Sequence, residues 1–192
     1  MNKLYVDGCS LTYGAGLDRK YSVGSQLGAE LDLSRPGKSN TAMVSDFYKH
    51  IDNYDTFVIG LTYPSRYTFY NDSVPIDLQP RKTTMDRLVE HPMGEFIENT
   101  YPQFYKVLWS LTNHREMKAL SNFYVNSIIS LLEKQNKKYL VYCWENLDCN
   151  NNNYFVPEVP RTREFLLEDG HFNEIGMELL ANIIKEKLNA KE

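Results

Sequence analysis

Apolar residues along the chain fall into two alternating patterns, short runs and helical repeats. Mainly apolar runs at 4–6, 55–62 and 138–144 stop at glycine or polar residues, which is typical of buried strands, and a brief strand is expected at 31–33. Apolar side chains recur at helical spacing over 21–31, 42–51, 104–135 and 174–185. This alternation predicts an α/β domain of three layers, α/β/α, with a mostly parallel sheet of about five strands in flavodoxin-like order.

One stretch, residues 63–103, breaks the pattern. It contains five prolines and shows no sustained period. We therefore expect a single domain over residues 1–192, with 63–103 as an insertion over the edge of the sheet and a candidate lid.

Composition and charge narrow the class of protein. The 192 residues include 21 Lys plus Arg against 25 Asp plus Glu, a formal net charge of −4, which disfavours sequence-independent binding of nucleic acid. Cys9, Cys143 and Cys149 are odd in number and form no C-x-x-C pair, so a disulfide framework is not expected. The sequence shows neither a signal peptide nor a membrane-spanning run, and we expect a cytoplasmic protein without a membrane partner.

Three loops at the strand-to-helix junctions carry candidate chemistry: 8–10, 36–40 and 169–171. In a parallel sheet such loops gather at one edge, where ligands bind. Ser10 follows the first strand, where a helix start offers free N–H groups to an oxyanion. Of the four histidines, only His171 has a carboxylate placed by a short loop, because Asp169 stands two residues before it. A serine, a histidine and a carboxylate are the parts of a nucleophilic triad.

These motifs resemble those of the SGNH or GDSL hydrolases, a family of flavodoxin-like serine esterases and deacetylases. Residues 6–14, Val-Asp-Gly-Cys-Ser-Leu-Thr-Tyr-Gly, are similar to the first block of the family, and residues 169–176, Asp-Gly-His-Phe-Asn-Glu-Ile-Gly, are similar to the last. The resemblance implies that Ser10 is the nucleophile and His171 the base. It also implies that the backbone N–H groups of Ser10 and Gly37 form the oxyanion hole.

The chain departs from the family pattern at three places. Cys9 stands where the first block usually has Asp; Cys9 could itself be read as the nucleophile, but a residue at the end of the strand is expected to point into the core. The third block usually reads Gly-x-Asn, whereas this chain has Gly60 followed by Leu and Thr62. Thr62 is therefore a candidate oxyanion donor in place of the Asn. Other residues that could take this place are Ser39, Asn40 and Arg66. The last block often has Asp three residues before His, a position held by Glu168, and we favour Asp169.

The resemblance predicts a serine esterase that needs no metal or cofactor. Asn40, Tyr63 and Arg66 are candidate substrate-binding residues, and Arg66 suits an anionic part of the substrate. Aromatic residues around the insertion favour a small acyl group, such as acetyl, on a carbohydrate. The alternatives are a catalytically impaired binding or assembly module, an O-acyltransferase with the same triad and, more remotely, a nucleotide-binding protein.

Overall fold

The computed structural model describes residues 3–64, 66–71, 74–78 and 114–190. Its elements, in chain order, are β1 (Leu4–Gly8), α1 (Ser10–Tyr13), the 3-10 helix η1 (Arg19–Tyr21), α2 (Val23–Leu27), β2 (Leu31–Asp32), α3 (Asn40–His50), β3 (Thr56–Leu61), β4 (Tyr67–Asn71), β5 (Val74–Leu78), α6 (His114–Lys134), β6 (Lys138–Cys143), β7 (Tyr154–Phe155) and α7 (Glu174–Asn189). Across these ranges, no helix has both the length and the hydropathy needed to cross a bilayer.

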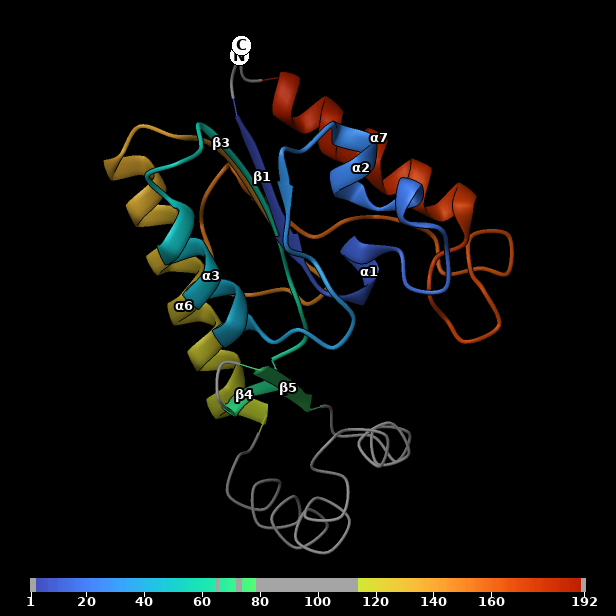
Figure 1. Cartoon of the computed structure of the whole chain (residues 1–192), viewed down its shortest axis with the longest axis horizontal. Helices are drawn as coiled ribbons and strands as arrows, with labels where there is room; N and C mark the ends of the chain where they lie inside the picture. The colour runs from blue at the N-terminus through green and yellow to red at the C-terminus, as the bar shows by residue number, and fades with distance from the viewer. Residues whose placement is uncertain (1–2, 65, 72–73, 79–113, 191–192) are drawn as a thin grey trace, which may run out of the picture.

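The central sheet has five strands in the order β2-β1-β3-β6-β7, and every neighbouring pair is parallel. Helices α3 and α6 cover one face of the sheet, and α2 and α7 cover the other (Figure 1). The chain runs outward from β1 to β2 and then back past β1 to β3, so α2 and α7 share one face while α3 and α6 share the other. The predicted α/β fold class and the flavodoxin-like strand order are confirmed.

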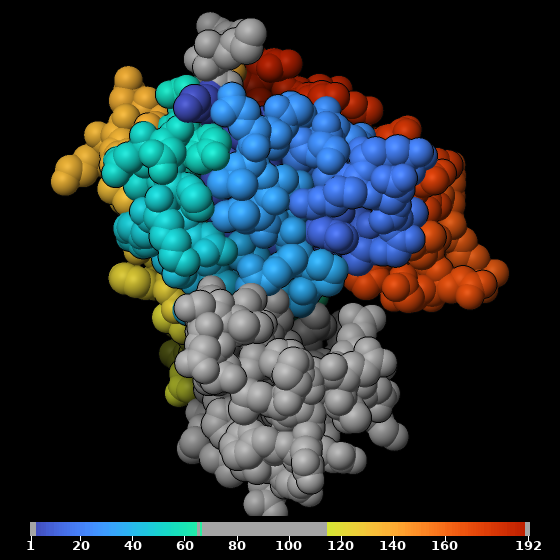
Figure 2. Space-filling view, viewed as in Figure 1, coloured from blue at the N-terminus to red at the C-terminus, as the bar shows by residue number. Residues whose placement is uncertain are grey.

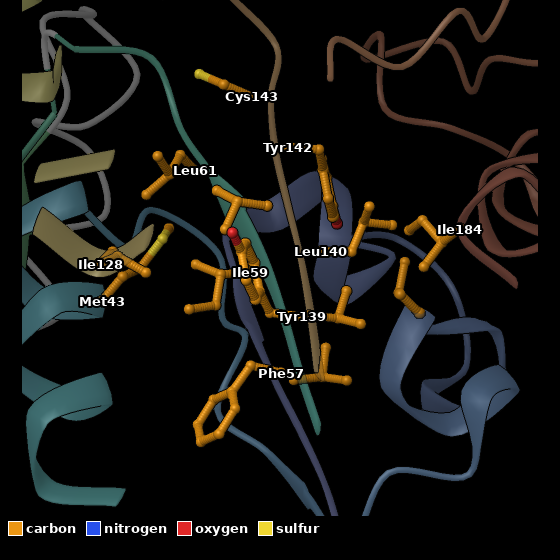
Figure 3. Close-up of a cluster of buried hydrophobic side chains, with 14 of the residues drawn as sticks. Met43, Phe57, Ile59, Leu61, Ile128, Tyr139, Leu140, Tyr142, Cys143 and Ile184 are labelled. Carbon is orange, nitrogen blue, oxygen red and sulfur yellow. The ribbon is translucent and has the colours of Figure 1, made fainter. Parts of the chain in front are cut away.

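The middle of the sheet forms the core, because β3 is buried along its whole length. Ile59 and Leu61 point toward Met43 of α3 and Ile128 of α6, whereas Leu140 points toward Ile184 of α7 (Figure 3). Ile59 and Leu61 are two residues apart on one face of β3, whereas Leu140 of β6 is paired with Val58 and faces the other side, so the sheet is apolar on both faces. The two helical layers are therefore anchored on one shared strand pair, β3 and β6.

Side-chain caps start the two helices that follow the site loops. Ser39 accepts a hydrogen bond from the backbone N–H of Ala42 at 3.2 Å and so caps α3. Asn173 does the same for Gly176 at 3.0 Å and caps α7. The caps fix where each loop ends, and thereby hold the residues just before each helix.

Several elements differ from the sequence-based expectation. The helix expected over 21–31 is reduced to η1 and α2, because Gly28 adopts a left-handed conformation with φ of 70° and ends α2 at Leu27. The short strand β7 lies just after the asparagine-rich loop and was not predicted. The start of the expected insertion contains an antiparallel hairpin, β4–β5, and most of the remainder lies outside the described residues. The prediction of a single domain with a lid stays a prediction.

Candidate active site

Helix α1 stands directly over the carboxyl ends of β1 and β3. Gly8 and Gly60 are paired across these strands, and both leave room for the side chain of Thr12. A Cβ atom at Gly60 would come within 2.5 Å of Thr12 Oγ1 and of Tyr142 Oη, which are themselves joined by a 2.8 Å hydrogen bond. The two glycines therefore seat α1, and with it Ser10, against the edge of the sheet.

Ser10 is the first residue of α1 and is buried, with 4% of its surface exposed. Cys9 precedes it in an extended conformation and is wholly buried, as expected for a residue at the end of a core strand. The backbone carbonyl of Ser10 accepts hydrogen bonds from Gly14 and Ala15 at 3.1 and 3.0 Å, which closes the turn after it. Within the described ranges, its hydroxyl has no hydrogen-bond partner.

Asp169 and His171 lie together in the loop before α7. Asp169 Oδ2 is 2.9 Å from Nδ1 of His171, and its Oδ1 accepts the backbone N–H of the same residue at 3.0 Å. These two hydrogen bonds hold the pKa of the Asp169 carboxyl below its usual value. With Nδ1 engaged, Nε2 is the ring nitrogen left to exchange a proton.

The loop that carries this pair is tied down by its own backbone. Leu167 donates to the carbonyl of His171 at 2.7 Å, and Gly170 takes a left-handed φ of 83° at the turn between Asp169 and His171. Asn173 N donates to the carbonyl of Phe165 at 2.9 Å just before α7 begins. Glu168, the other candidate carboxylate, is exposed and makes no hydrogen bond to His171.

Gly37 lies in the second site loop, where its φ of 83° requires glycine. The next residue, Lys38, is completely buried. Its Nζ is 2.6 and 2.7 Å from the two carboxylate oxygens of Asp7 and 2.8 Å from Oδ2 of Asp46, and it donates to the carbonyl of Leu33 at 3.1 Å. An ammonium held by two carboxylates and a carbonyl therefore fixes the backbone beside Gly37.

Burial sets the electrostatics of this ion cluster. It raises the pKa of Asp7 to about 6, although the charge and hydrogen bonds of Lys38 pull the other way. Asp46 is only partly buried, so the opposing hydrogen bonds and charges of Lys38 and Lys49 outweigh desolvation and lower its pKa. Sequence reasoning missed this cluster. Its one visible signal is Asp7, an acidic residue that continues a buried apolar strand.

Asn40 fixes the backbone at the end of β3. Its Oδ1 accepts the N–H of Thr62 at 2.7 Å, and its Nδ2 donates to the carbonyl of Thr62 at 3.0 Å and to Ser121 at 3.1 Å. The hydroxyl of Thr62 is wholly buried and has no hydrogen-bond partner among the described residues, and this is the group expected to serve as an oxyanion donor. Both amide hydrogens of Asn40 are thus used in hydrogen bonds to Thr62 and Ser121. The predicted contact of Asn40 with substrate stays a prediction.

Replacement of Asn40 by alanine is expected to lower the free energy of unfolding by about 2–4 kcal/mol. The reason is that the buried N–H of Thr62 loses its acceptor while two further bonds are lost. Urea denaturation followed by circular dichroism would measure the loss, with Thr41→Ala, an exposed neighbour on α3, as the matched control. A loss no larger than that of the control would show that Asn40 does not fix Thr62.

The remaining predicted residues lie just beyond β3. Tyr63 is half-buried, and its hydroxyl accepts a hydrogen bond from Nη2 of Arg161 at 3.5 Å. Arg66 donates its backbone N–H to the carbonyl of Tyr63 at 3.3 Å, and its Nη1 is buried with no partner in the part of the chain that the structure describes. Elsewhere in the described ranges, His, Cys, Asp and Glu side chains do not gather in threes to form a metal site.

The structure brings Asp169 into hydrogen-bond contact with His171, and Asn40 with Thr62. Helix α1, which begins at Ser10, follows β1 at the carboxyl edge of the sheet (Figure 1). The structure shows no hydrogen bond between Ser10 and His171, so their pairing belongs to the proposal below. The fold and these loops define a flavodoxin-like α/β protein with a serine after its first strand and an Asp-x-His sequence before its last helix.

The chain shares its overall fold with two proteins of known structure, one of which is an esterase. The psychrotrophic esterase EstA from Pseudoalteromonas sp., in a structure inhibited by monoethylphosphonate, superposes with a TM-score of 0.55 at 9% identity, over 99% of this chain and 98% of that one. TesA superposes with the same TM-score at 12% identity, over 98% of each chain. No protein-family model and no curated protein sequence matches the chain. Both superpositions extend over nearly the whole chain, so they support the α/β fold described above.

Proposed function

We propose that this protein is a serine esterase that hydrolyses esters of a small acyl group, in which Ser10 is the nucleophile, His171 the base and Asp169 the residue that orients the base. The observation that carries the proposal is the 2.9 Å hydrogen bond that Nδ1 of His171 donates to the carboxylate of Asp169, at the edge where Ser10 begins α1. The fold shared with EstA and TesA supports it.

In the proposed reaction, Nε2 of His171 takes the hydroxyl proton of Ser10 while Oγ attacks the ester carbonyl. Asp169 stabilises the imidazolium, and the backbone N–H groups of Ser10 and Gly37 stabilise the oxyanion. The unpaired hydroxyl of Thr62 is the third donor. The imidazolium then gives its proton to the departing alcohol, and water, activated by His171, releases the acid from the acyl-enzyme.

The natural substrate we propose is an O-acetyl ester on a carbohydrate. A small acyl group fits the closed surroundings of Ser10, which has only 4% of its surface exposed. The ring of Tyr63 at the end of β3 offers one surface on which a sugar can pack. The Lys38 cluster supports catalysis by keeping Gly37 in place.

Covalent labelling with ethyl p-nitrophenyl methylphosphonate tests the assignment of the nucleophile. Ser10 Oγ is expected to displace p-nitrophenolate from phosphorus, so that the intact mass rises by one phosphonyl group per chain as activity toward p-nitrophenyl acetate disappears. Ser10→Ala is expected to show neither labelling nor turnover. Cys9→Ala, the neighbouring substitution, is expected to show both.

Two results would overturn the proposal. Labelling of Ser10→Ala at the rate of the wild type would place the nucleophile elsewhere. A folded wild type that neither labels nor hydrolyses p-nitrophenyl acetate would favour the binding or assembly module.

A further inference from the structure

A pocket of about 640 Å³ opens beside the loop of Asp169 and His171. It is lined by two arginines, two leucines, a glutamate and a glycine: Arg161, Arg163, Leu166, Leu167, Glu168 and Gly170. Gly170 stands between Asp169 and His171 in the sequence, so the wall of the pocket includes the residue that links them.

One of the residues that line the pocket also contacts the loop that follows α1. Leu167 lies against Gly16, where a Cβ atom would come within 2.8 Å of Leu167 Cδ1. In the space-filling view, the dark blue residues of the first loop border the orange and red residues of the carboxyl-terminal segment (Figure 2). Leu167 therefore connects the wall of the pocket to the loop that follows the proposed nucleophile.

The guanidinium of Arg161 is held in place by aromatic rings. It lies 5.6 Å from the ring centre of Trp144, just after β6, and 5.4 Å from that of Phe172, the residue next to His171. Its Nη2 also donates to the hydroxyl of Tyr63 beyond β3. Stacking of this kind leaves the edge of the guanidinium open for paired hydrogen bonds, and it limits the entropy lost when an anion binds.

The charges in the pocket favour an anion. Within the described part of the chain, neither Arg161 nor Arg163 is paired with a carboxylate. Glu168 is the one carboxylate among the lining residues, so the lining carries two positive charges and one negative charge. Guanidinium groups form strong bidentate bonds with carboxylate and phosphate alike.

The volume indicates which part of an ester the pocket receives. About 640 Å³ is within the usual range of small-molecule sites and is far more than an acetyl group needs. The alcohol part of the ester is the larger part. Building on the proposed esterase function, we propose that this pocket binds the alcohol part of the substrate and that Arg161 and Arg163 hold an anionic group on it, a carboxylate or a phosphate.

Three acetyl esters test this site: 4-acetoxybenzoate, 4-acetoxyphenyl phosphate and the neutral methyl 4-acetoxybenzoate. Each is compared between the wild type and Arg161→Met or Arg163→Met, so that differences in intrinsic reactivity cancel. In the arginine variants, we expect kcat/KM for the anionic ester that the pocket binds to fall at least about tenfold more than kcat/KM for the neutral ester. The loss is expected mainly as a rise in KM. A larger loss for the phosphate than for the benzoate identifies a phosphate site, and the reverse identifies a carboxylate site.

Lys185→Met removes the same charge from an exposed position on α7 and is expected to leave all three rates unchanged. Equal losses for the neutral and anionic esters in the arginine variants would overturn the proposal. If no ester is hydrolysed, the esterase function fails, and calorimetry with 4-hydroxybenzoate and 4-hydroxyphenyl phosphate decides on the anion site. Binding that weakens tenfold or more in Arg161→Met supports the site, and absence of binding overturns it.

Discussion

His171→Ala is expected to lower kcat for p-nitrophenyl acetate by at least about 10⁴-fold, because the hydroxyl of Ser10 loses its base. The side chain of His171 is partly exposed, and its ring contributes no core packing, so the fold is expected to survive the change. The measurement is steady-state hydrolysis by protein whose far-ultraviolet circular dichroism matches that of the wild type. Added imidazole is expected to restore part of the rate by replacing the missing ring.

His50→Ala is the matched control for this loss. The ring of His50 packs against Tyr5 and Tyr54 near the amino-terminal ends of the strands, opposite to the proposed site. Its replacement is expected to change kcat less than twofold. Should His171→Ala retain more than a tenth of the wild-type rate, His171 is not the base.

Lys38→Met is expected to lower the free energy of unfolding by about 3–5 kcal/mol, because it leaves the buried Asp7 carboxylate and the partly buried Asp46 carboxylate without their shared ammonium. Methionine fills a similar volume, so the loss reports mainly the charge. Urea denaturation at pH 8 measures the effect. Lys49→Met is the control, since Lys49 also contacts Asp46 but its side chain is 60% exposed, and a change below about 0.5 kcal/mol is expected.

The dependence of this loss on pH gives a second readout. The pKa of Asp7 in the folded wild type is about 6, above its value in an unfolded chain, so the folded state binds the proton first and stability rises as pH falls through 6. Removing Lys38 takes away the charge that opposes this shift. The variant is therefore expected to regain more stability than the wild type between pH 8 and pH 5. If the loss stays constant over this range, Asp7 is not the group that Lys38 neutralises.

The strands and main helices of the fold could be predicted because their pattern is local. The six buried residues of β3 and the apolar repeat of α7 are each readable within one segment. Helix α1 and strand β7 could not be read in this way, because they have four and two residues and depend on tertiary contacts. Thr12 of α1, for example, is placed by Tyr142 and by two glycines from separate strands.

The residues of the candidate site likewise fall into those that a local motif indicates and those that only tertiary contacts reveal. Ser10, Asp169 and His171 stand in short motifs, so the sequence indicated them without any knowledge of their neighbours. Lys38 gave no such signal, because its burial depends on Asp7, which is remote in sequence. The position of Arg161 could not be predicted either, because it depends on contacts with Trp144, Phe172 and Tyr63, which come from three separate segments. Charged residues that acquire a role through distant partners are what sequence reasoning missed.

The position of α7 bears on how the protein is made. Ser10, Lys38 and their supporting strands lie early in the chain, whereas Asp169 and His171 are placed by the loop and cap of α7, which packs against α2. Contacts between segments so far apart form late and only after a large loss of chain entropy. A nascent chain that has folded its first strands thus holds the proposed nucleophile without its base. The proposed triad is complete only when α7 docks.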